Sequence, residues 1–217
     1  MPPALRRRFS SALTFLERHP LLEAPLVFAV AFPAGLWHPV FWILVPLLVW
    51  RAQGLDDRKF GVCWAFGSPA FHLVTLGVTL GGYALAHAAV ARLWLRLPFE
   101  PHLPRDFLLL VPHHFFAVAL PEEFLFRGYL QTRLDDAWGR PYTLLGARWG
   151  AALPASAAVF ALCHLVHGDV TQLKVFFFGL LAGWLREKTG GLLAPVFYHA
   201  LGNLLLELLL ATFPGRG

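Results

Sequence analysis

Long apolar segments dominate this sequence and limit what it can fold into. Of its 217 residues, 57% are hydrophobic and only 14% are charged, whereas a soluble domain carries about a quarter charged residues. The apolar runs extend over roughly 17–25 residues, the length of a transmembrane helix, without the alternation of a transmembrane barrel strand. The sequence therefore predicts an all-α protein, a polytopic transmembrane helical bundle of about six to eight spans.

Three segments are expected from the distribution of these runs. Residues 1–20 are basic and amphipathic, and we expect a retained helix there rather than a cleaved signal peptide. Residues 21–100 hold the N-terminal spans, of which 21–50 is interrupted by prolines and predicts two short spans or a hairpin. Residues 101–217 hold four candidate spans, at 105–132, 150–166, 171–187 and 191–212.

The basic residues lie in short loops between the apolar runs, so the net charge of +5 indicates membrane topology rather than binding to nucleic acid. With a cytoplasmic N-terminus and two crossings in residues 21–50, twelve Lys and Arg residues fall on the cytoplasmic side and five on the other. The polar loop around 135–148 is expected to be solvated. Six tryptophans near predicted span ends are expected to be interfacial anchors: Trp50, Trp64, Trp94, Trp138, Trp149 and Trp184.

Three ionisable residues interrupt the apolar run of residues 105–132. Glu122 and Glu123 are adjacent, and Arg127 follows one helical turn later. Charged groups at membrane depth are costly without partners and mark functional sites by default. Glu123 and Arg127 share a helix face and can pair, while Glu122 points about 100° away. A carboxylate in this setting can act as a general base, although a purely structural ion pair is the alternative.

Polar residues also occur in two later spans. His164 lies one turn after Phe160, and His199 and Asn203 are four residues apart. Polar groups in hydrocarbon need partners, so we expect these residues and the glutamates to meet in one cavity. A carboxylate and an imidazole can deprotonate water, while an asparagine and a second imidazole can donate hydrogen bonds to an oxyanion.

Three ordered motifs resemble those of a known family. Glu122-Glu123-Phe-Leu-Phe-Arg127 matches EExxxR, Phe160-Ala-Leu-Cys-His164 matches FxxxH, and His199-Ala-Leu-Gly-Asn203 matches HxxxN. In this order they resemble the motifs of the CPBP family, the CAAX-protease and bacteriocin-processing (Abi) family of glutamate-type intramembrane proteases. The resemblance covers residues 105–212, about half of the chain, and makes the C-terminal four spans the expected catalytic core.

The resemblance implies a role for each motif residue. Glu122 would activate the hydrolytic water with His164 as its partner, Glu123 and Arg127 would support it, and His199 with Asn203 would stabilise the oxyanion. The implied substrate is a membrane-anchored protein or peptide, cut near a C-terminal tail or lipidated end in a bacterial inner membrane. No cofactor is expected.

Two alternatives remain open. Glu122, His164 and His199 would suit zinc in a metalloprotease, although the HExxH spacing is absent. The chain could instead be a non-catalytic membrane protein, such as an immunity factor, a scaffold or an isoprenoid-lipid binder, because family resemblance does not guarantee activity. Cys63 and Cys163 do not have the spacing of a zinc site, and Cys163 is expected to be a packing residue.

Overall fold

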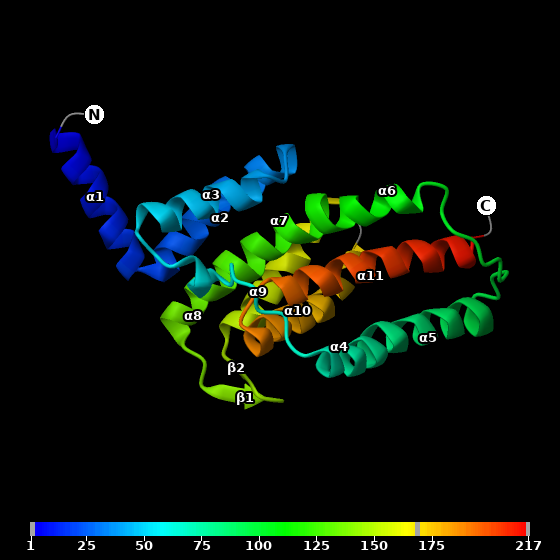
Figure 1. Cartoon of the computed structure of the whole chain (residues 1–217). Helices are drawn as coiled ribbons and strands as arrows, with labels where there is room; N and C mark the ends of the chain where they lie inside the picture. The colour runs from blue at the N-terminus through cyan, green and yellow to red at the C-terminus, as the bar shows by residue number, and fades with distance from the viewer. Residues whose placement is uncertain (1–2, 168–169, 216–217) are drawn as a thin grey trace. The chain divides into compact units, whose positions relative to one another are not determined.

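The chain is mainly helical, as the sequence predicts (Figure 1). The computed structural model describes residues 3–167 and 170–215. It groups into two compact units, each made of two sequence segments. The first combines residues 1–66 with 120–195, and the second combines 67–119 with 196–217. The division into residues 1–20, 21–100 and 101–217 remains a prediction about the sequence.

The first unit contains most of the helices and one small sheet. Its helices are α1 (Pro3–Arg18), α2 (Pro20–Trp37), α3 (Phe41–Ala52), η1 (Asp57–Phe60), α7 (Leu120–Glu123), η5 (Phe124–Gln131), α8 (Thr132–Trp138), α9 (Ala152–Cys163), η6 (His164–His167), η7 (Val170–Lys174) and α10 (Val175–Thr189). Strands β1 (Tyr142–Leu144) and β2 (Ala147–Trp149) form an antiparallel hairpin in which Thr143 faces Arg148. Gly190 ends α10 with a left-handed φ of +77°, which a residue without a side chain adopts readily.

The second unit contains long apolar helices with π-helical stretches. Its elements are α4 (Pro69–Leu76), η2 (Gly77–Gly81), α5 (Gly82–Ala89), η3 (Val90–Trp94), α6 (Phe107–Pro112), η4 (His113–Ala119) and most of α11 (Leu193–Thr212). Ser68 caps α4, because its hydroxyl accepts a hydrogen bond from the Phe71 backbone N–H at 3.3 Å, and Pro69 suits the first helical position.

Four helices are long and apolar enough to cross a membrane: Pro20–Trp37, Pro69–Trp94, Phe107–Trp138 and Leu193–Thr212. Phe41–Ala52 and Ala152–Val166 are shorter apolar helices, which makes six apolar helices in the described residues. The 12 residues of α3 rise only about 18 Å, less than the hydrocarbon core of a bilayer. Helix α3 packs against α2, so residues 21–50 form a helical hairpin.

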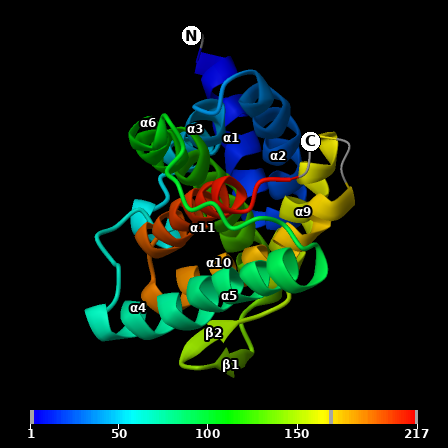
Figure 2. The same cartoon turned by 90° about the vertical axis from the view of Figure 1, so that its right-hand side faces the viewer.

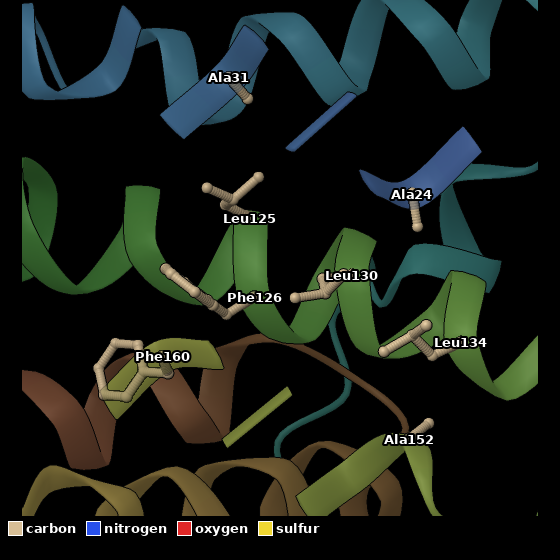
Figure 3. Packing of buried hydrophobic residues seen from close by; sticks show 8 residues of the cluster. All are labelled: Ala24, Ala31, Leu125, Phe126, Leu130, Leu134, Ala152 and Phe160. Carbon is tan, nitrogen blue, oxygen red and sulfur yellow. The ribbon is translucent and has the colours of Figure 1, made fainter. Parts of the chain in front are cut away.

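The core of the first unit forms around the helix that carries the glutamates. Leu125 and Leu130 belong to one buried cluster with Ala31 of α2, while Phe126 meets Phe160 of α9 edge-on at 5.0 Å. Figure 3 shows this helix between α2 on one side and α9 on the other. We call this helix, formed by α7, η5 and α8 (residues 120–138), the motif helix. Both of its faces are held by packing.

Two glycines allow α10 to lie against α9. A Cβ atom at Gly179 would come within 2.9 Å of the Ala157 Cβ, and one at Gly183 within 2.9 Å of the Leu153 Cγ. This four-residue spacing of glycines is the pattern that lets membrane helices approach closely. Helices α9 and α10 lie side by side in both views (Figures 1 and 2).

Trp50 differs from its predicted role as an interfacial anchor. It is completely buried in the first unit, stacked on Phe60 at 4.1 Å and Phe124 at 5.0 Å, and its indole N–H donates to Asp57 at 3.0 Å. Trp64, Trp94 and Trp138 remain exposed, as anchors should be. Trp50 therefore fixes η1 and α3 against the motif helix.

Candidate active site

The first motif places a buried ion pair at the junction of α7 and η5. The Arg127 Nη1 lies 3.0 Å from the Glu123 Oε1, and neither side chain is exposed to solvent. This is the pair that the four-residue spacing predicts. Glu122 is only partly buried, and its carboxylate is also within electrostatic range of Arg127. The two adjacent glutamates therefore have different surroundings.

Arg127 is held by an aromatic ring as well as by a carboxylate. Its guanidinium carbon lies 4.3 Å above the ring centroid of Phe160, within the range of a cation–π contact. Gly179 of α10 leaves room for it, because a Cβ there would come within 3.2 Å of the Arg127 Nη2. Among the described residues, the Nε and Nη2 atoms have no hydrogen-bond partner. The arginine therefore keeps donors that the fold itself does not use.

His164 lies at the end of α9, one turn beyond the same Phe160. Its Nδ1 lies 2.8 Å from the Phe160 carbonyl oxygen. A carbonyl oxygen only accepts, so Nδ1 carries the proton and Nε2 of the neutral ring is an acceptor. The imidazole also meets the Phe160 ring edge-on at 4.5 Å. An orientation fixed in this way suits a residue that accepts a proton through Nε2.

Phe160 thus connects two motifs, because it contacts both Arg127 and His164. Glu122 is also within electrostatic range of Cys163, the neighbour of His164. Cys163 itself packs against the buried cluster around Phe160, as the sequence predicts. Glu122, Glu123, Arg127 and His164 therefore all belong to the first unit, where Phe160 lies between Arg127 and His164.

His199 and Asn203 lie on α11 in the second unit. His199 is buried and Asn203 is partly buried. In the same unit, the His114 Nε2 lies 3.9 Å from the Glu207 Oε1, and both His199 and Glu207 are within electrostatic range of His114. The meeting of His199 and Asn203 with Glu122 and His164 remains a prediction.

Within the described residues, no three His, Cys, Asp or Glu side chains are grouped to hold a metal ion. The zinc-binding alternative joins residues of both units, Glu122 and His164 in the first and His199 in the second. It therefore remains a separate hypothesis with its own test.

A second buried charge network was not expected from the sequence. Glu23 of α2 accepts hydrogen bonds from the Tyr129 hydroxyl at 2.5 Å and from Gln53 at 2.7 Å. It also accepts from the Nε and Nη2 atoms of Arg133, at 3.0 and 2.9 Å. The only sequence signal was an acidic residue within an apolar run, and its partners are far away along the chain. This network joins α2 to the end of the motif helix.

Comparisons with known proteins agree with the motifs. Residues 104–205 match the family "Rce1-like: Type II CAAX prenyl endopeptidase Rce1-like". An "Uncharacterized 24.3 kDa protein" from Escherichia coli is 31% identical over 152 residues, covering 65% of this chain and 61% of the relative. The alignment thus spans about three fifths of the relative's length. No solved structure matches the chain. The matched residues 104–205 contain all three motifs, so the family model agrees with the resemblance that the sequence shows.

Proposed function

We propose that this protein is a glutamate-type intramembrane endopeptidase that cuts membrane-anchored polypeptides near a C-terminal tail or a lipidated end. The observation that carries the proposal is the arrangement in the first unit of a partly buried Glu122, a buried Glu123–Arg127 pair and a His164 whose Nδ1 is engaged. The family match and the apolar helices support a membrane protease acting within a lipid bilayer.

Glu122 is the general base in this proposal. It takes a proton from a water molecule, whose oxygen attacks the carbonyl carbon of the scissile peptide bond, while the His164 Nε2 helps to orient that water. The tetrahedral intermediate collapses, the carbon–nitrogen bond breaks, and Glu122 returns the proton to the leaving amine. No nucleophilic serine or cysteine takes part.

Glu123 and Arg127 support this step without carrying the proton. Their ion pair fixes the start of η5, and the positive charge of Arg127 lies within electrostatic range of the Glu122 carboxylate. His199 and Asn203 would donate hydrogen bonds to the oxyanion. We place the protein in a bacterial inner membrane, which the relative from Escherichia coli supports.

C-terminal proteomics of membranes from cells carrying wild type or Glu122→Gln at matched abundance tests the proposal. We expect a set of anchored proteins to retain their C-terminal tails only with Glu122→Gln. Glu100→Gln, which removes an exposed carboxylate between η3 and α6, is the matched control and should resemble wild type. Identical proteomes for wild type and Glu122→Gln would overturn the assignment.

A chelator experiment separates this mechanism from the zinc alternative. Cleavage by the purified protein should continue at an unchanged rate in the presence of a zinc chelator. Loss of cleavage, followed by recovery on addition of zinc, would assign Glu122, His164 and His199 to a metal site instead.

A further inference from the structure

The hairpin between α8 and α9 has an apolar tip that its own unit does not cover. Leu145 at the tip is 75% exposed, and Tyr142 and Leu144 on β1 are each more than half exposed. Trp138, at the end of α8, is also exposed. In Figures 1 and 2 the hairpin projects away from the helices of the first unit. This small two-stranded hairpin therefore exposes several large apolar side chains.

The register of the hairpin gives it one apolar and one polar face. Tyr142 pairs with Trp149 and Leu144 pairs with Ala147, so these four side chains share a face. Ala147 is fully buried, whereas its partner Leu144 is exposed. The other face carries Thr143 and Arg148, both exposed. On the apolar face, the β2 residue Ala147 is therefore buried, whereas the β1 residues Tyr142 and Leu144 are exposed.

Leu145 occupies a position where the turn disfavours a leucine. Leu145 and Gly146 are the two central residues, with φ values of +50° and +80°. A two-residue turn of this kind favours Asn, Asp or Gly at its first position, because other residues are strained in the left-handed region. Folding of the hairpin alone would be better served by Asn. An exposed leucine in a strained position points to a role outside the fold.

Hydrogen bonds from α10 hold the strained tip in place. The Trp184 indole N–H donates to the Leu144 carbonyl at 3.1 Å, and the Lys188 ammonium donates to the Leu145 carbonyl at 2.7 Å. Arg140, before β1, pairs with Glu187 of α10 at 2.6 Å. The hairpin is therefore a braced element, and its apolar tip has a defined direction.

We propose that the hairpin tip is an interfacial membrane anchor, with Leu144 and Leu145 inserted below the headgroups of an anionic leaflet. The leucines share a strand end with Tyr142, and the hairpin follows the exposed Trp138 at the end of α8. This is the composition of a membrane interface, where amphipathic rings lie at headgroup level. The exposed cations of Arg148 and Lys188 complement anionic headgroups. The sequence also assigns this loop to the side that collects twelve of the basic residues. The proposal does not depend on peptidase activity.

Spin labelling in bilayer discs tests the depth of the tip. A label is placed on Leu145→Cys in a background with Cys63→Ala and Cys163→Ala, in discs of phosphatidylethanolamine and phosphatidylglycerol. We expect oxygen to relax the label more strongly than a water-soluble nickel chelate, as for Val78→Cys in the span Pro69–Trp94. For a label on Thr143→Cys, on the polar face, the nickel chelate should relax the label more strongly than oxygen.

A label at 145 that the nickel chelate relaxes more strongly than oxygen would overturn the proposal. If a membrane-anchored peptide then protected that label, the tip would be a substrate contact instead of a lipid anchor.

A second variant covers the case in which labelling disturbs the tip itself. With the label on Leu144→Cys, adding Leu145→Asn keeps a residue that the turn accepts and removes the apolar side chain. We expect at least a twofold rise in nickel accessibility, and an unchanged value would contradict insertion of Leu145.

Discussion

Two buried arginines on the motif helix, Arg127 and Arg133, have opposite environments. Arg133 uses all three of its nitrogens: Nε and Nη2 donate to Glu23, and Nη1 lies 2.6 Å from Asp136. Arg127 makes one ion pair, with Glu123, and lies over the Phe160 ring. Its Nε and Nη2 have no hydrogen-bond partner among the described residues. The two sites lie fewer than two helical turns apart on a continuous helix.

This difference would distinguish a structural network from the proposed catalytic one. A buried charge is tolerated when hydrogen bonds satisfy it fully, and such a site resists change. The Glu23–Arg133 network meets that condition and connects α2 to the motif helix. Arg127 retains unused donors near Glu122 and Glu123, which agrees with the supporting role proposed for it. Both arginines are buried. They differ in how many of their nitrogens have hydrogen-bond partners.

The largest stability effect is expected from Glu23→Ala. This change leaves Arg133 buried without its main partner, which costs about 3 kcal/mol or more when a buried pair is broken. Unfolding in a mild detergent titrated with SDS measures the loss, and the specific activity of the remaining folded protein should be retained. Glu100→Ala, at an exposed position, is the control. Unchanged unfolding in Glu23→Ala would mean that the network does not join α2 to the motif helix.

Arg127→Lys and Arg133→Lys sharpen the comparison directly. Lysine cannot pair with Glu123 and cover the Phe160 ring as a planar guanidinium does. We expect Arg127→Lys to lower the cleavage rate about 100-fold, which is about 2.7 kcal/mol of activation free energy, with a small effect on unfolding. Arg133→Lys should lower the unfolding free energy more strongly and the cleavage rate only slightly. Equal losses of rate in both variants would end the distinction between the sites.

Gly179→Ala should act on the contact between α9 and α10. The added Cβ would meet the Ala157 Cβ at 2.9 Å and the Arg127 Nη2 at 3.2 Å. Overpacking of this kind costs about 1–3 kcal/mol, and the shift of Arg127 should also reduce the cleavage rate. Gly82→Ala is the matched control, because nothing lies within 4 Å of its added Cβ. A fully stable and active Gly179→Ala would show that the helices can separate without effect.

Tyr129→Phe is expected to have the smallest effect. It removes the hydroxyl that donates to Glu23 at 2.5 Å and leaves the ring in its aromatic stack. Because Glu23 keeps its bonds from Arg133 and Gln53, we expect a loss of about 1 kcal/mol in unfolding free energy and an unchanged cleavage rate. A large fall in rate would place Tyr129, and with it the Glu23 network, in the chemistry.

Local spacing predicted the first site and missed the second. The Glu123–Arg127 pair follows from a four-residue separation on one helix, so the sequence alone indicates it. The Glu23–Arg133 pair joins residues 110 positions apart, and no local pattern indicates which helix packs on α2. The helical membrane class followed from the apolar runs, because length and hydropathy are local properties.

The polar loop around residues 135–148 and Trp50 also show that local sequence patterns do not indicate tertiary partners. The sequence suggested solvated charges around 135–148, yet Asp135 is buried and lies 3.7 Å from Arg140, which also pairs with Glu187 of α10. Trp50 was expected at an interface and is buried under Phe60 instead. Both errors arise from tertiary packing, which assigns partners that a linear pattern does not contain.

Cleavage by purified Glu122→Gln tests the central claim most directly. Wild type and Glu122→Gln, with unfolding free energies confirmed to be equal, are compared in the same bilayer discs on a peptide anchored by a C-terminal lipid. Loss of the general base should slow the single-turnover rate by about 10²–10⁴-fold, with peptide binding retained. Cleavage at the wild-type rate would show that Glu122 is not the base and would contradict the account of the site.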